Sequence, residues 1–269
     1  METLSVQLHH QEIDICIIDS TMSTMIGRSQ IARYTWYFAE RDPENHSTGV
    51  AIAVKTNIDS LYKPKASIIA TGRILMLRLQ KRNQDITIIS AYAPGEQHPV
   101  QQKQSFWKSL QQCIRQLPNR TSCIVGIDAN GTIGKRNPTP VEPIAGPHGA
   151  TNWNTNGEAL YHMASYCNMS IVNTLNTTRN TDITFHNIPP ARAGTRIDYI
   201  LISTKLLANI DNNQGTWKEA QLTIPPRRID HEAVMIQITL PKFTGDKTVV
   251  THTIDLARLK THIKQSTYF

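Results

Sequence analysis

Residues that could do chemistry follow an apolar run near the middle of the chain. The run Ser122–Ile127 leads into Asp128-Ala-Asn130, and Gly131 comes directly after. A short apolar run that ends at a turn residue predicts a strand. Residues two apart on a strand point to the same side, so Asp128 and Asn130 would share one small space. A carboxylate there can hold a hard cation or orient a histidine, and an amide can bind a phosphate oxygen, although the pair alone is also typical of an Asx turn.

Other predicted strands also carry polar residues at or near their ends. Asp198 lies in the apolar run 196–202, where a buried carboxylate is costly unless it is paired. His231 precedes the predicted strand 233–240 and is a candidate partner, because an Asp–His pair fixes the imidazole tautomer and raises its basicity. The remaining members of this set are Tyr92, Thr184 and Asp230. Taken singly, each has a structural alternative: a rim tyrosine, a β-forming threonine, and a turn or cap residue.

The combined set indicates one kind of reaction. It provides acidic groups for a divalent cation, a histidine with an orienting carboxylate, and neutral donors for a phosphate. Those are the parts of metal-assisted phosphodiester hydrolysis. A serine hydrolase would need a Gly-x-Ser-x-Gly elbow, and a nucleotide-binding protein a P-loop or Gly-x-Gly-x-x-Gly; the sequence contains none of these.

The elements that must position these residues are mostly short strands. Strands at this density, joined by short turns, indicate sheets packed on each other. An amphipathic helix is expected over 100–117, and a second helix opens with the capping box Thr155-Asn-Gly-Glu158. The intervening loop 131–154 is long for a compact domain, which is typical of a functional or disordered segment. We expect strands at 12–18, 49–54, 66–70, 74–79, 85–92, 122–127, 170–172, 183–186, 196–202 and 233–240.

Composition is that of an ordinary globular chain with a basic excess. The 269 residues are 39% hydrophobic and 18% charged, with a formal net charge of +7, which suits a polyanionic partner such as nucleic acid. No apolar run is long enough to span a membrane, and the start lacks a secretory pattern. The four cysteines match no zinc spacing, which favours a reducing compartment, the nucleus or cytoplasm.

The order of five motifs resembles a known family. Ile-Ser-Ala-Tyr-Ala-Pro is followed by Gly-Ile-Asp-Ala-Asn-Gly, Asn-Gly-Glu-Ala-Leu, Thr-Arg-Ile-Asp-Tyr-Ile-Leu and Asp-His-Glu-Ala-Val. Between about residues 12 and 240, this succession is similar to the endonuclease/exonuclease/phosphatase superfamily. The likeness is strongest to the endonuclease domains of non-LTR retrotransposons and to craniofacial development protein 2-like sequences.

The resemblance implies an α+β fold, a four-layer α/β/β/α sandwich without a counterpart of the family's first strand. It implies one endonuclease/exonuclease/phosphatase-like domain at 1–241, with 242–269 as a C-terminal tail that resembles a linker to an absent reverse transcriptase. The expected activity is that of a phosphodiesterase dependent on Mg²⁺ (or Mn²⁺), a DNA endonuclease that leaves a 3′-hydroxyl. DNA or RNA is the expected partner and no membrane is involved; the sequence indicates no oligomeric state.

The family mechanism, carried over by the matching motifs, assigns a role to each residue. Asp198 would orient His231, and the histidine would position or deprotonate the attacking water or stabilise charge on the phosphate. Asp128 would hold or activate the nucleophile, and Asn130 would bind the phosphate. The remaining roles are contact with the scissile phosphate by Tyr92, substrate binding nearby by Thr184, and metal binding by Asp230.

The chain also departs from the family pattern near its start. The family's first strand carries an Asn that binds phosphate and metal, and nothing before Ile13 fits it. The next strand usually ends in Gln-Glu-Thr, but here Ser20 takes the place of the metal-binding Glu and Asp19 stands one position early. A slip of one residue flips a side chain to the other face, so Asp19 would need a bulge or turn to bind metal. Two alternatives follow: a catalytically decayed module that still binds nucleic acid, or an enzyme for phosphoinositides or other small phosphate esters.

Overall fold

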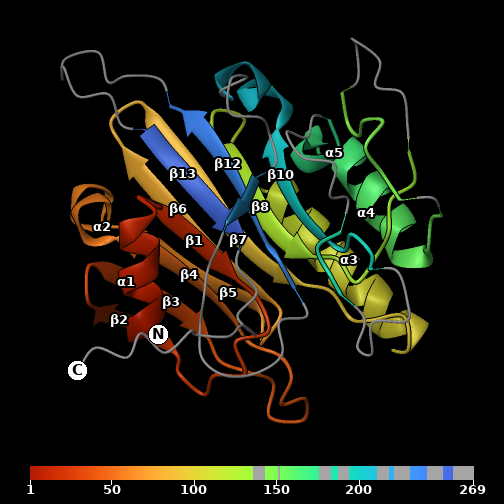
Figure 1. Ribbon diagram of the computed structural model, residues 1–269, viewed down its shortest axis with the longest axis horizontal. Helices are drawn as coiled ribbons and strands as arrows, with labels where there is room; N and C mark the ends of the chain where they lie inside the picture. Colours follow the sequence, from red (N-terminus) through yellow and green to blue (C-terminus); the bar gives the residue numbers. More distant parts are fainter. Residues whose placement is uncertain are drawn as a thin grey trace, which may run out of the picture.

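The computed structural model describes residues 1–135, 143–150, 152–175, 183–186, 194–210, 218–220, 231–240 and 251–256. Within them the chain forms two β-sheets that pack face to face, with helices on the outer sides (Figure 1). The seven-stranded sheet has the order β11 (Lys218–Ala220), β12 (Ala233–Thr239), β13 (Thr251–Leu256), β1 (Ile15–Ile18), β4 (Val50–Lys55), β3 (Tyr34–Ala39) and β2 (Gly27–Ile31). The six-stranded sheet has the order β5 (Lys65–Ala70), β6 (Ile74–Lys81), β7 (Gln84–Tyr92), β8 (Ser122–Asp128), β10 (Asp198–Ser203) and β9 (Met169–Ile171).

Three apolar clusters account for the layers. The first lies between the sheets and joins residues such as Ile52 and Ile236 to Ile88 and Ile200. The second packs α3 (Val100–Arg115) and α4 (Thr155–Tyr166) onto the six-stranded sheet, and the third packs α1 (Glu2–His10) onto the seven-stranded sheet. The predicted α+β fold and its four-layer α/β/β/α sandwich are therefore confirmed.

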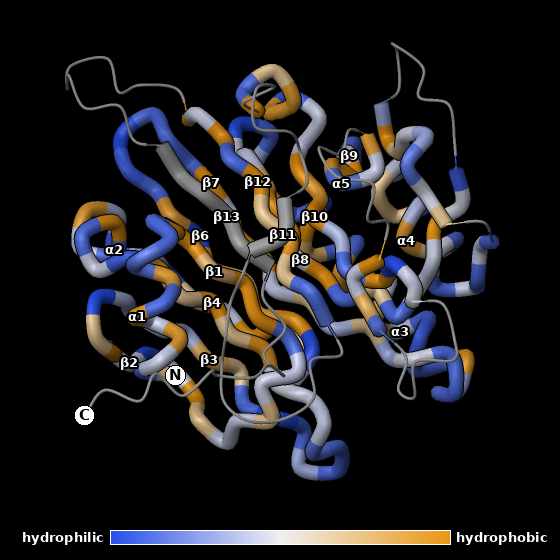
Figure 2. The backbone as a smooth tube through the Cα atoms, in the orientation of Figure 1, coloured by the Kyte–Doolittle hydropathy of each residue, from blue (hydrophilic) through white to orange (hydrophobic). Residues whose placement is uncertain are grey.

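The remaining helical pieces are short: α2 (Thr56–Tyr62), α5 (Val172–Leu175) and the 3-10 helix η1 (Thr204–Asn209). Colouring by hydropathy shows apolar residues concentrated along the central strands (Figure 2). β7 has eight buried residues followed by the half-buried Tyr92, because this strand is covered on both faces. In the described part of the chain, no helix combines the length and apolar character needed to cross a membrane.

Two local expectations are corrected. The first turn of α4 is capped by Asn154, whose side chain accepts a hydrogen bond from the backbone N–H of Gly157, and not by a box that starts at Thr155. The predicted strand 183–186 is reduced to isolated bridges, in which Phe185 pairs with Thr195 and with His231. The cap is a local difference between neighbouring residues, whereas Phe185 pairs with residues from elsewhere in the chain.

The neighbourhood of β1 is completed from the far end of the chain. The described residues before β1 form the helix α1, and none of them forms the first strand that the family resemblance would lead one to expect. β1 pairs in parallel with β13, with Ile15 opposite Ile254, and β13 pairs antiparallel with β12. Residues 251–256, which the sequence places in a C-terminal tail, thus take part in the seven-stranded sheet. The domain boundary at 241 stays a prediction.

Candidate active site

Three of the predicted site residues lie in one row across adjacent strands. β7 and β8 pair in parallel with Tyr92 opposite Asp128, and β8 and β10 pair antiparallel with Asp198 opposite Asp128. Opposed residues on neighbouring strands have their Cα atoms about 5 Å apart. Asp128 and Asp198 are buried, with exposed fractions of 0% and 1%. The sheet register therefore brings together residues that are far apart in sequence.

His231 reaches this row from the other sheet. Its Nδ1 lies 2.8 Å from Oδ2 of Asp198, and both side chains are 1% exposed. An ionised carboxylate can only accept, so Nδ1 donates and the second ring nitrogen, Nε2, is left as the basic position. The ring also packs against Phe185, with centroids 4.8 Å apart. The predicted Asp–His pair is present, and its tautomer suits a general base.

Thr184 connects the backbones that carry this pair. Its hydroxyl oxygen accepts hydrogen bonds from the N–H groups of Ile197 and Asp198, both at 3.1 Å. Its carbonyl oxygen accepts one from the N–H of Glu232 at 2.7 Å. Asn173 adds a further hold, donating through Nδ2 to the carbonyl oxygen of Asp198 at 3.0 Å. These bonds fix the distance between the strand that carries the carboxylate and the residue after His231.

Asp128 and Asn130 form a tight polar turn at the end of β8. The N–H of Asn130 donates to Oδ1 of Asp128 at 2.8 Å, and its Nδ2 donates to the carbonyl oxygen of Ala93 at 2.8 Å. Asn130 adopts a left-handed backbone with φ of 46°, which asparagine tolerates better than most residues. The Asx turn, which the sequence offered as the alternative, is therefore present. Because β8 ends at Asp128, the strand alternation expected to bring Asn130 to the same side does not extend to Asn130.

Arg73, which the sequence reasoning missed, lies beside Tyr92. Its guanidinium carbon is 5.2 Å from the centroid of the Tyr92 ring, and Nη1 donates to the Tyr92 carbonyl oxygen at 3.2 Å. Burial lowers the pKa of Arg73, while Tyr92, Asp42 and Asp128 nearby act in the opposite direction. An arginine stays charged under such shifts, so the row has a fixed positive charge next to it.

Of the two predicted metal ligands, Asp19 and Asp230, the structure describes only Asp19. Asp19 is buried directly after β1, and Ser20 after it has a left-handed backbone with φ of 48°. The role of Asp19 as a metal ligand stays a prediction. The hydroxyl of Ser90 donates to the carbonyl oxygen of Ile18 at 2.9 Å, which ties this end of β1 to β7. Asp230 lies outside the described residues.

The described side chains do not by themselves assemble a metal centre. Among the residues that the structure places, no three His, Cys, Asp or Glu side chains gather closely enough to hold a metal ion. Mg²⁺ or Mn²⁺ stays a prediction from the family resemblance, and no chemical step is assigned to it.

The similarity of this chain to known proteins is one of structure. No protein-family model matches the sequence, and no curated protein matches it. The endonuclease domain of TRAS1, a telomere-specific non-LTR retrotransposon, has 17% identity over 89% of this chain and 92% of its own, with a TM-score of 0.59. AP endonuclease LMAP from Leishmania major has 11% identity over 78% of this chain and 75% of its own, with a TM-score of 0.58. The catalytic domain of Xenopus laevis APE2 has 15% identity over 97% and 90%, with a TM-score of 0.53.

These likenesses, at low identity but over most of each chain, concern the fold. The protein shares the α/β/β/α fold of these structures, as the sequence motifs implied.

Proposed function

We propose that this protein is a phosphodiesterase that nicks DNA and leaves a 3′-hydroxyl. The observation that carries the proposal is the buried pair of Asp198 and His231, 2.8 Å apart, next to Asp128 in the sheet register. The fold shared with endonucleases and the net charge of +7 support a nucleic-acid substrate.

Each residue in or next to the row has a role in the proposed reaction. His231 accepts a proton from the attacking water through Nε2, and Asp198 stabilises the imidazolium that forms. Asp128 positions that water, and the amide of Asn130 and the hydroxyl of Tyr92 contact the phosphate oxygens. Arg73 places positive charge where the pentacovalent phosphate gains negative charge. The water oxygen bonds to phosphorus, the bond from phosphorus to O3′ breaks, and O3′ takes up a proton from solvent, so the products are a 5′-phosphate and a 3′-hydroxyl.

A divalent cation fits the expected chemistry as a Lewis acid on the phosphate oxygens. Asp19 and Asp230 are the residues that we expect to hold it.

The test is a nicking assay on supercoiled plasmid with Mg²⁺, Mn²⁺ or EDTA, run beside the variant His231→Asn. We expect metal-dependent nicks that a DNA polymerase can extend, since extension requires a 3′-hydroxyl, and none from the variant. Equal nicking by both proteins would reveal a contaminating nuclease and overturn the assignment.

The two alternative functions predict different results in these assays. Salt-sensitive DNA binding without cleavage at any metal concentration would indicate the decayed binding module, because phosphate contacts weaken as salt rises. The substitution of Ser20 for the family's Glu favours this second candidate. Release of phosphate from phosphoinositides in place of DNA nicking would favour the small-ester enzyme.

A further inference from the structure

One buried side chain, Asn156, joins the two loops that follow β7 and β8. It lies in the first turn of α4 and is 0% exposed. Its Nδ2 donates to the carbonyl oxygen of Pro94 at 2.8 Å and to that of Asn130 at 3.3 Å. Pro94 comes two residues after Tyr92, and Asn130 two after Asp128. A single amide group therefore holds both loops that carry the candidate site.

The orientation of this amide is set by Trp107. The indole Nε1 donates to Oδ1 of Asn156 at 3.1 Å, and an indole N–H can only donate. The oxygen of the amide must therefore face α3, and its NH₂ group must face the two loops. The Asn156 side chain, which would be costly to bury unsatisfied, has partners for both polar atoms.

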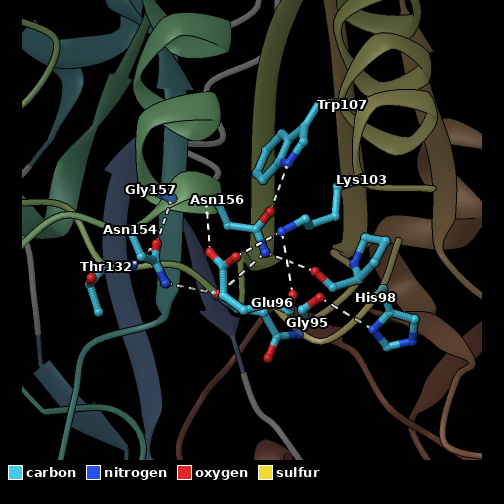
Figure 3. Close-up of polar contacts among 11 residues, drawn as sticks. Gly95, Glu96, His98, Lys103, Trp107, Thr132, Asn154, Asn156 and Gly157 are labelled. Carbon is cyan, nitrogen blue, oxygen red and sulfur yellow. Dashed lines mark hydrogen bonds and ion pairs between the residues drawn. The ribbon is translucent and has the colours of Figure 1, made fainter. Parts of the chain in front are cut away.

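The backbone around Asn156 is held as firmly as its side chain. Its N–H donates to Oε1 of Glu96 at 3.0 Å, and the other oxygen of Glu96 lies 2.8 Å from Nζ of Lys103 (Figure 3). A Cβ on Gly157 would lie 1.9 Å from the carbonyl oxygen of Thr132, so only glycine permits this approach. The start of α4 is thus pressed directly against the chain that leaves the site turn.

Asn130 is the residue that needs such support. Its left-handed backbone, with φ of 46°, costs about 1 to 2 kcal/mol for most residues with a Cβ and less for asparagine. Strained conformations persist where surrounding contacts over-determine them. The carbonyl oxygen of Asn130 accepts from Asn156 and, at 3.5 Å, from Nδ2 of Asn154.

We propose that Asn156 is a positioning residue of the candidate site: it sets the separation of Tyr92 from the Asp128–Asn130 turn and fixes the backbone of Asn130. This inference rests on the proposed function for its catalytic consequence, but the positioning itself can be measured without substrate. Asn156 does not touch the substrate and acts through the two loops that it joins, chiefly through Asn130.

The first experiment measures backbone hydrogen exchange in wild type, Asn156→Ala and Leu110→Ala. Leu110 is a fully buried residue of α3 whose side chain has no polar group to hold either loop, and its truncation controls for general loss of stability. We expect exchange at the N–H groups of Asn130 and Gly131 to accelerate in Asn156→Ala by at least tenfold more than in Leu110→Ala. Equal acceleration in both variants would overturn the proposal, whether or not the protein cleaves DNA.

The second experiment is a double-mutant cycle on nicking. Asn156→Ala should lower kcat about a hundredfold, the effect of a displacement of about 1 Å at a reacting group, with little change in KM. In an Asn130→Ala background the same substitution should have almost no further effect, because the two residues act as one unit. Additive losses would contradict a role through Asn130.

A third variant, Trp107→Phe, disturbs the packing less than Asn156→Ala and so separates the effect of the amide orientation from misfolding. Trp107→Phe keeps the aromatic packing and removes only the N–H that orients Asn156. We expect it to fold and to lose three- to tenfold in kcat, and to lose nothing further when Asn156 is already alanine. An unchanged kcat in Trp107→Phe, with the protein folded, would mean that the amide orientation does not matter for the site. If wild type does not cleave, the proposed function fails and the exchange result alone decides the positioning role.

Discussion

Two buried carboxylates stand near strand ends of the same sheet, and they have different partners. Asp85, near the start of β7, has Arg78 at 2.5 Å and Arg120 at 3.2 Å. Asp198, at the start of β10, has His231 at 2.8 Å. The exposed fractions of the two aspartates are 6% and 1%. The two carboxylates are thus buried to a similar extent, and they differ in the chemistry of their partners.

The difference shows how the same group can serve stability or reaction. An arginine stays protonated at any ordinary pH, so the pair around Asp85 carries fixed charges and exchanges no proton. A histidine changes charge near neutral pH, so the pair around Asp198 can accept and return a proton. Tyr92, at the far end of the strand that begins beside Asp85, lies opposite Asp128 in the row with Asp198. One end of the six-stranded sheet is therefore built for rigidity, and the other end has the groups of a catalytic site.

The largest expected effect comes from Asp198→Asn. The amide is nearly isosteric but no longer stabilises an imidazolium, and general-base catalysis contributes about 10² to 10⁴ in rate. We expect kcat for nicking to fall about a thousandfold, while the free energy of unfolding at pH 7 changes by less than that of Asp85→Asn. The measurements are plasmid nicking rates and urea unfolding. A folded Asp198→Asn protein with full activity would break the comparison between the two carboxylates.

Substitution of Arg73 tests whether its guanidinium group, at the end of the sheet that carries the candidate site, affects the reaction. Arg73→Gln removes the positive charge beside Tyr92 and Asp128, and we expect kcat to fall about tenfold to a hundredfold, because charge stabilisation is lost in the transition state. Arg73→Lys should recover part of the rate. The matched control is Arg78→Gln at the opposite end of β6, which should lower stability and leave kcat of the folded protein unchanged. Equal kcat losses in both variants would remove the distinction between the ends.

Asp85→Asn should act on stability and follow pH in a defined direction. The hydrogen-bonded guanidinium of Arg78 lowers the pKa of Asp85 below its usual value, against the opposing effect of burial. A lowered folded-state pKa means that the stabilisation is complete above the unfolded pKa of about 4 and is lost as pH falls through the folded value. We expect a loss of about 2 kcal/mol at pH 7, typical of charged hydrogen bonds. In urea unfolding, the gap from wild type should narrow below about pH 4; a gap independent of pH would contradict this account.

The smallest effect is expected from Arg120→Gln. The Arg120 side chain is 68% exposed, whereas that of Arg78 is 29% exposed. Exposed ion pairs contribute about 0.2 to 1 kcal/mol and are screened by salt. Thermal unfolding of Arg120→Gln should differ little from wild type and the difference should vanish at high salt. A loss as large as that of Arg78→Gln would mean that exposure does not rank the two arginines.

Much of the fold was predictable from local patterns. Alternating and continuous apolar runs located the core strands, as in β7 and β8, because side chains repeat every two residues along a strand. The stripe of the predicted helix 100–117 agrees with α3, which ends at Arg115. Asp198 was expected to need a partner, because burying a lone carboxylate is costly, and His231 is that partner.

Other features depended on which strands become neighbours. Arg73 comes close to Tyr92 because β6 pairs with β7 with Ile74 opposite Ala91, a register that no local pattern shows. Residues 251–256 form a strand beside β1. Both outcomes depend on long-range strand pairing, which local sequence does not encode. The cap of α4 at Asn154 in place of Thr155 is a local difference, since Asn154 accepts a hydrogen bond from the N–H of Gly157, three residues later.

The sequence by itself therefore determined the kinds of elements and the polar residues at their ends. Only the tertiary structure decided that Tyr92, Asp128 and Asp198 form one row, and that Asn156 joins the two loops beside it. The physical reason is one of range. Apolar periodicity acts over a few residues, whereas the site depends on strand register and on hydrogen bonds between residues tens of positions apart.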